Sequence, residues 1–62
     1  MNNSKKQVGT IKYDAKHDAY FIQSGSQVFS LFLFQIDDSL LGETVAFSHN
    51  QVNETQTFEV IQ

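Results

Sequence analysis

The side chains that could carry out acid–base, nucleophilic or metal chemistry are few in this chain of 62 residues. Cysteine is absent from the sequence, so disulfides and thiolate-bound zinc are excluded. We interpret both histidines, His17 and His49, as exposed surface residues. Asp37-Asp38 is interpreted as the capped start of a turn before Leu40, not as a metal site. Because no nucleophile, base and orienting group can be assembled, we expect no catalytic residue, no metal site, no cofactor and no enzyme activity.

The lysines are the second chemically informative feature, because all four precede His17. They are followed by six of the seven acidic residues, and the net charge is −3. One interpretation is a solvated surface with uneven charge. The other is a local positive patch that meets phosphate and is opposed by an acidic back. Such a patch would bind nucleic acid weakly, since few lysines release few counterions.

The elements that must position these residues are short strands. Apolar residues make up 40% of the chain and charged residues 18%, as in globular domains. No window has a convincing helical period, whereas five segments have strand-like composition or alternation. These segments are residues 8–13, 19–23, 28–34, 43–48 and 55–61. They predict an all-β fold, a small five-stranded antiparallel barrel, because closure leaves few exposed strand edges.

The connections between the strands and the ends of the chain complete this prediction. Residues 24–27 are a turn cluster, residues 35–41 a connection that can hold one helical turn, and residues 49–54 a polar loop. We expect a flexible tail over residues 1–7 and a single domain over residues 8–62. No apolar run approaches the ~20 residues of a membrane span, and no secretory signal follows the first lysines. The expected location is therefore cytoplasmic.

Five segments follow one another in an order and spacing that resemble a known family. They are Gly9 to Tyr13, Ala19 to Ile22, Val28 to Phe32, Leu41 to Phe47, and Gln56 to Val60. In these segments the chain resembles the cold-shock proteins, with motifs of the types G-x-V-K-W-F, G-F-G-F-I, V-F-V-H-F and E-G-x-x-V-x-F. The resemblance implies a five-stranded OB-like barrel that binds single-stranded RNA or DNA.

The resemblance also implies which residues would bind nucleic acid. Bases would stack on aromatic rings and phosphates would contact lysines. The candidates are Lys12, Tyr13, Lys16, Tyr20, Phe21, Phe29 and Phe32. Tyr20 and Phe21 are adjacent and point to opposite faces of a regular strand, unless a bulge turns both outward.

Two functions remain open at this point. The first is binding of single-stranded nucleic acid with low sequence specificity, with no membrane and no small-molecule substrate involved. The second is a protein-interaction module that uses the same aromatic face for a homodimer or another partner. The acidic balance, Leu31 in place of the family histidine and Asp14 in place of an aromatic residue favour the second function. The collinear order of the segments and the position of Lys12 and Lys16 beside Tyr13 favour the first, which is the prediction made here.

The expected core comes from the alternation of apolar and polar residues. Six side chains are predicted to be buried: Ile11, Ile22, Val45, Phe47, Phe58 and Val60. The segment Val28 to Phe34 is apolar on both faces and leaves two alternatives. Simple alternation buries Phe29, Leu31 and Leu33, whereas the family resemblance buries Val28 and Ser30. Either way, some apolar side chains of this segment face outward, which is typical of an interface or a binding site.

Overall fold

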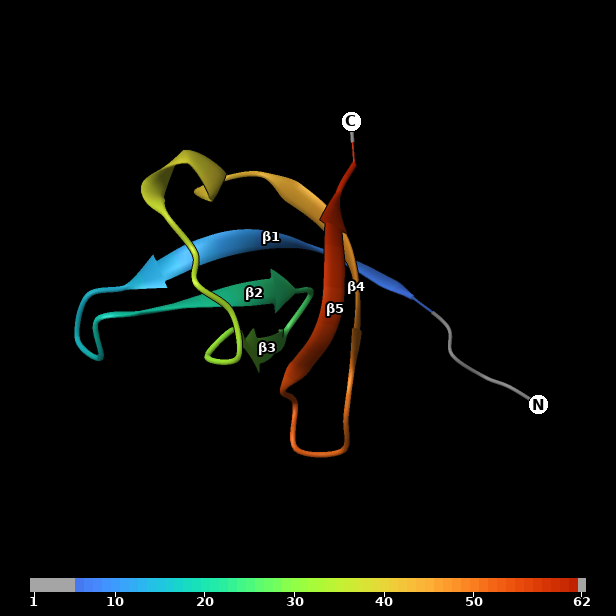
Figure 1. Ribbon diagram of the computed structural model, residues 1–62. Helices are drawn as coiled ribbons and strands as arrows, with labels where there is room; N and C mark the ends of the chain where they lie inside the picture. The colour runs from blue at the N-terminus through green and yellow to red at the C-terminus, as the bar shows by residue number, and fades with distance from the viewer. Residues whose placement is uncertain (1–5, 62) are drawn as a thin grey trace.

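The computed structural model describes residues 6–61 as five strands and one turn of 3-10 helix (Figure 1). The prediction of an all-β chain with a five-stranded antiparallel sheet is confirmed. Of the tail predicted over residues 1–7, residues 1–5 lie outside the described residues, and the first strand already begins at Gln7. The elements are β1 (Gln7–Asp14), β2 (Ala19–Ser24), β3 (Gln27–Ser30), η1 (Asp38–Leu40), β4 (Thr44–His49) and β5 (Thr55–Val60).

The strands form one curved sheet in the order β3-β2-β1-β4-β5. Its two edge strands approach each other at an isolated parallel bridge between Ser30 and Glu54. Ser30 N donates to the carbonyl of Asn53 at 2.9 Å, and Asn53 Nδ2 donates to the Val28 carbonyl at 3.2 Å. Asn53 has a φ of 59°, a left-handed conformation that asparagine tolerates. The β4–β5 loop therefore binds the edge of β3, while closure into a complete OB-like barrel stays a prediction.

The β1 strand bends because it pairs with two partners along its length. Its first part pairs with β4 and its second part with β2, and the two registers overlap at Thr10. A Cβ atom on Gly9 would lie 2.5 Å from Ile22 Cγ2 and 2.8 Å from the Gln23 carbonyl oxygen. Glycine at this position is what allows β2 to approach β1 so closely.

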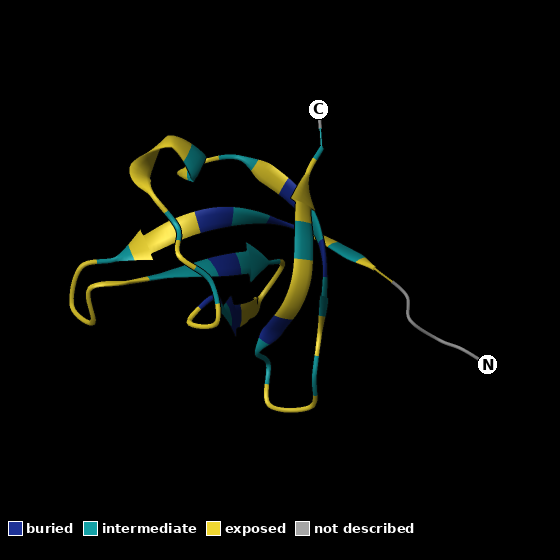
Figure 2. Ribbon diagram, in the orientation of Figure 1, coloured by how far each residue is buried: buried dark blue, intermediate teal, exposed yellow. Residues whose placement is uncertain are grey.

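The core lies inside the curved sheet, and buried residues occur on every strand and on the chain after β3 (Figure 2). The predicted burial of Ile11, Ile22, Val45 and Phe47 is confirmed. Phe29 and Leu31 complete the cluster of buried apolar residues. Phe58 is only partly buried at the margin of this cluster.

Val60 was predicted to be buried, and this prediction is wrong because Val60 is 38% exposed. It lies opposite Val45 in the β4–β5 ladder. Val45 is covered from both sides, since it is also paired with Gly9 of β1. Val60 belongs to an edge strand and has such a neighbour on one side only.

The segment Val28 to Phe34 follows neither alternative over its whole length. Alternation holds as far as Leu31, so Phe29 and Leu31 are buried, and the family-based expectation of an outward Phe29 is wrong. The strand then ends at Ser30 and the chain turns, with Phe34 N donating to the Leu31 carbonyl at 2.9 Å. As a result Leu33 is 55% exposed, whereas Phe34 is partly buried and packs edge-on against Phe58.

The connection after this turn contains the expected helical turn. Asp37 caps η1, because its side chain accepts a hydrogen bond from Ser39 N at 3.0 Å. Tyr20 of β2 donates a hydrogen bond from its hydroxyl to Asp38. This bond ties the helical turn to the sheet.

Candidate nucleic-acid interface

The strand register brings a lysine and an aromatic ring together on the solvent side of the sheet. Lys12 of β1 is paired with Phe21 of β2, and Phe21 is paired with Ser30 of β3. The next row, Ile11–Ile22–Phe29, belongs to the core, so the Lys12 row faces solvent. Directly opposed side chains of antiparallel strands lie about 5 Å apart at Cβ. Lys12 is exposed and Phe21 is half-buried.

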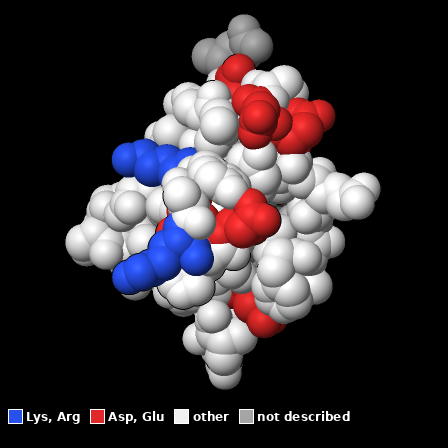
Figure 3. Space-filling model, turned by 90° about the vertical axis from the view of Figure 1, so that its left-hand side faces the viewer, with Lys and Arg blue, Asp and Glu red and all other residues white. Residues whose placement is uncertain are grey.

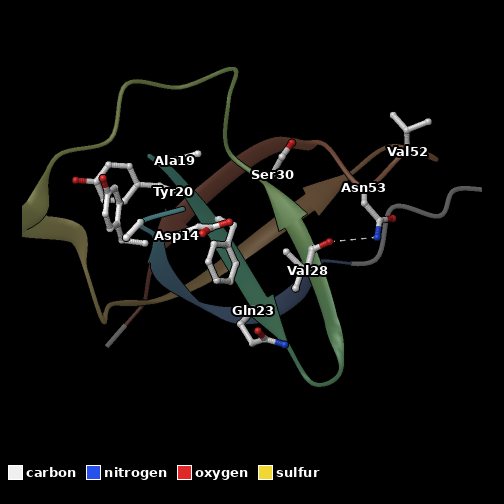
Figure 4. Close-up of a pocket in the computed structure, with 11 residues that line it drawn as sticks. Asp14, Ala19, Tyr20, Gln23, Val28, Ser30, Val52 and Asn53 are labelled. Atoms are coloured by element: carbon white, nitrogen blue, oxygen red, sulfur yellow. Dashed lines mark hydrogen bonds between the residues drawn. The ribbon is translucent and has the colours of Figure 1, made fainter. Parts of the chain in front are cut away.

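A shallow pocket of about 650 Å³ lies beside this row (Figure 4). Phe21, Val28 and Gln23 come from the sheet, and Val52 and Asn53 come from the β4–β5 loop. Val28 is 48% exposed and Val52 is 71% exposed, which gives the pocket an apolar margin. Figure 4 shows the hydrogen bond from the Asn53 amide to the Val28 carbonyl, which holds the loop at this edge. We call this surface, from Lys12 and Phe21 to Val28 and Val52, the Lys12 face.

The two tyrosines form a pair at the end of the β1–β2 hairpin and line the same pocket as Phe21. Tyr13 and Tyr20 are register partners, and their ring centroids lie 5.1 Å apart. Tyr20 packs against the core, whereas Tyr13 is 41% exposed. Since Lys12–Phe21 and Tyr13–Tyr20 are consecutive pairs, no bulge turns Tyr20 and Phe21 to the same side.

The hydroxyl groups of both tyrosines are bound by carboxylates. Tyr13 donates to Asp18, and this hydrogen bond raises the pKa of Tyr13 above its ordinary value. The hydrogen bond to Asp38, burial and the charge of Asp38 raise the pKa of Tyr20 to about 12. Both phenols are therefore neutral hydrogen-bond donors at neutral pH.

The β1–β2 turn carries Lys16 and a close contact between Asp14 and His17. The Asp14 carboxylate accepts from Lys16 N at 3.0 Å and contacts His17 Nδ1 at 2.7 Å. The contact with His17 lowers the pKa of Asp14 below its usual value. Lys16 itself is exposed in the turn, beyond the end of the Lys12 row.

The structure brings most of the predicted binding residues together. Tyr13, Tyr20 and Phe21 line the same pocket, Lys12 is paired with Phe21 beside it, and Lys16 lies in the turn. Phe29 was predicted to stack on bases, and this is wrong because its ring is 0% exposed and packs against Phe47. Phe32 is 65% exposed, but it lines a different pocket.

Sequence reasoning missed the residues that border the Lys12 face. Val28 was considered only as part of an ambiguous apolar run, and Val52 was not considered. The signal for Val52 was its apolar side chain in an otherwise polar loop, His49 to Glu54. The part played by Asn53 depends on its left-handed backbone and its bond to β3, which no local pattern indicates.

Comparison with known proteins finds no matching family model, no matching curated protein and no matching solved structure. Within residues 6–61, no group of three or more histidine, aspartate or glutamate side chains is arranged to hold a metal ion. The same part of the chain contains no helix with the length and hydrophobicity of a membrane span.

Proposed function

We propose that this protein binds single-stranded RNA or DNA, with little sequence specificity, on the Lys12 face. The observation that carries the proposal is the direct pairing of exposed Lys12 with Phe21 on the solvent side of β1 and β2. An aromatic ring next to a cation is the minimal arrangement for one nucleotide, because every base has a face that can stack and every nucleotide has a phosphate. The resemblance to cold-shock proteins supports the same chemistry.

Each side chain then has a defined task. A base stacks on Phe21, and the apolar margin formed by Val28 and Val52 covers the edge of that base. Lys12 contacts the adjacent phosphate, and Lys16 in the turn is available to a second phosphate along the strand. Low specificity follows because stacking accepts any base.

Electrostatics make this binding weak and dependent on salt. Lys6, Lys12 and Lys16 are the cations among residues 6–61, and Asp14 adds negative charge beside the pocket. Few phosphates are neutralised, so few counterions are released on binding. We therefore expect dissociation constants in the micromolar range or weaker at physiological salt.

Fluorescence anisotropy with labelled oligo-dT and oligo-U at low salt tests the proposal. Phe21→Ala should lose about 1–3 kcal/mol of binding free energy. Phe32→Ala is the matched control, because Phe32 is more exposed but lies away from the Lys12 face. Lys12→Ala should flatten the salt dependence by about one phosphate contact, whereas Lys6→Ala should have a smaller effect. Absence of binding by the wild-type protein at high micromolar concentration rejects the proposal.

A protein interface on the same face is the second candidate. The observation in its favour is the exposure of Val28 and Val52 next to Phe21, since contiguous apolar surface is typical of protein interfaces. Sedimentation equilibrium separates the two functions. A wild-type dimer that becomes monomeric on Val52→Ser, together with no oligonucleotide binding, would assign this face to self-association.

A further inference from the structure

A second pocket, of about 630 Å³, lies between the β1–β2 turn and the chain that follows β3. Asp18 lies in the turn, and Asp37 is the residue directly before η1. We call this pocket the acidic groove. Most of its wall is apolar: Ala19, Tyr20, Leu31, Phe32, Phe34 and Ile36. Its volume lies within the range of pockets that hold small ligands and is ample for one large side chain.

The outer part of the groove's apolar wall, formed by Phe32, is exposed to solvent. Phe32 is 65% exposed, and the neighbouring Leu33 is 55% exposed. These side chains face outward because the chain leaves the sheet after Ser30, while Leu31 and Phe34 pack against the core. Two adjacent large apolar side chains held outward by a turn are typical of a contact surface.

The charges at the groove are negative. Asp18 and Asp37 line the groove, and Asp38 binds the hydroxyl of Tyr20. Hydrogen bonds from the Ser39 side chain and backbone lower the pKa of Asp37, so this carboxylate is ionised at neutral pH. Within residues 6–61, no lysine forms a salt bridge with any of these three carboxylates.

The view in Figure 3 is of the side of the molecule that carries the β1–β2 turn. Lysine side chains lie towards the left of this view, one of them beside acidic side chains at the centre, and further acidic side chains lie in the upper and lower parts. A phosphate backbone would be repelled by the carboxylates that line the groove, and a cationic segment would be attracted to them. The charge at the groove therefore indicates a different class of ligand from the one proposed for the Lys12 face.

We propose that the acidic groove binds a basic peptide segment of a partner protein. One aromatic or aliphatic side chain of that segment occupies the pocket against Tyr20 and Phe34, and Phe32 covers it from outside. Lysine or arginine residues on either side of this anchor face Asp18, Asp37 and Asp38. Apolar contact supplies most of the affinity, and the charges select the partner and orient it. This inference does not depend on nucleic-acid binding.

The test uses a labelled peptide of alternating lysine and phenylalanine, followed by fluorescence anisotropy at low salt. The wild-type protein should bind it, and added salt should weaken the complex. The triple variant D18N/D37N/D38N should lower the affinity about tenfold, the combined effect of three exposed charge contacts. A glutamate–phenylalanine peptide of equal length should not bind.

The three asparagine substitutions remove charge while keeping the local structure. Asparagine tolerates the left-handed φ of 53° at position 18. At position 37 it is an equally good helix cap, and at position 38 its carbonyl still accepts from Tyr20. The matched control is the variant E43Q/E54Q/E59Q, which changes the net charge by the same amount at residues that do not line the groove.

Further measurements separate this proposal from other occupants. Phe32→Ser should weaken peptide binding, whereas Phe21→Ala on the Lys12 face should leave it unchanged. Equal losses in the two triple variants would overturn the proposal, because binding would then reflect net charge alone. The absence of peptide binding by the wild-type protein would also overturn the proposal. A different result would assign the groove to a second copy of the chain. In that case the wild-type protein would self-associate and bind no peptide, and D18N/D37N/D38N would abolish the self-association whereas E43Q/E54Q/E59Q would not.

Discussion

The β4 strand and the segment Val28 to Phe34 both contain large apolar residues, but they bury them to different extents. In β4, Val45 and Phe47 are completely buried and alternate with residues that are exposed or half-buried. In the second segment, Ser30 is the one polar residue, and the segment leaves the sheet directly after it. Only Phe29 and Leu31 of this segment are fully buried.

The number of partner strands explains the difference. β4 pairs with β1 on one side and with β5 on the other, so its backbone is held in extended form along its length. β3 is an edge strand of four residues that pairs with β2. Because its other edge meets the β4–β5 loop at one bridge only, the chain can turn after Ser30. Apolar composition indicates burial, but the pairing decides how far the strand continues.

The largest difference in stability should come from replacing the buried ring of Phe29 and the exposed ring of Phe32 by alanine. Phe29→Ala removes a fully buried ring and should cost about 3–5 kcal/mol of unfolding free energy, as should Phe47→Ala in β4. Phe32→Ala should change stability by less than about 0.5 kcal/mol, since its ring is mostly exposed. Urea denaturation followed by circular dichroism measures both.

Because Phe29→Ala could prevent folding, a milder substitution at the same position is also needed. Phe29→Leu keeps most of the buried volume and should cost less than about 2 kcal/mol. The contrast between the two rings is contradicted if Phe32→Ala and Phe29→Ala destabilise the protein equally.

An intermediate effect should come from the contact that joins the two regions. The rings of Phe34 and Phe58 meet edge-on with centroids 5.0 Å apart. A double-mutant cycle of Phe34→Ala and Phe58→Ala should give a coupling energy of about 0.5–1.5 kcal/mol. The same cycle with Phe32 in place of Phe34 should give a coupling near zero. Equal couplings would mean that the turn after Ser30 has no preferred packing on β5.

The smallest effect concerns the bond that holds η1 to the sheet. The pKa of Tyr20 is raised to about 12 from an ordinary value of 10.0, chiefly by its hydrogen bond to Asp38. A raised pKa means that the bond stabilises the fold fully below pH 10.0 and loses its effect as the pH rises towards 12. We therefore expect the link between η1 and β2 to be insensitive to pH in the neutral range.

The titration can be measured by ultraviolet absorbance of the phenolate. Tyr13→Phe removes the only other tyrosine, so the absorbance change then reports on Tyr20 alone. In this background Asp38→Asn should lower the midpoint towards 10.0, because the charged acceptor is lost. An unchanged midpoint would show that burial, and not Asp38, controls the titration.

Many individual residues of the candidate site could be predicted from the sequence, but their arrangement in space could not. Lys12 and Phe21 were both selected, and their pairing on one face follows from the β1–β2 register. Phe29 was selected with them and is buried, because nothing local distinguishes the two sides of an uninterrupted apolar run. Val52 was missed because it reaches the Lys12 face through the bridge between the β4–β5 loop and β3.

The sequence alone determined the all-β class, the number of strands and most of the core, because alternation and turn residues act within a few positions of the chain. It also determined the separation of lysines from most carboxylates. The tertiary structure decided that Val60 is exposed, that the strand ends at Ser30 and that Asp18 and Asp37 line one groove. These outcomes depend on which strand lies beside which and on the space left for each side chain. Such contacts join residues that are far apart in the sequence, so the local pattern of residues does not predict them.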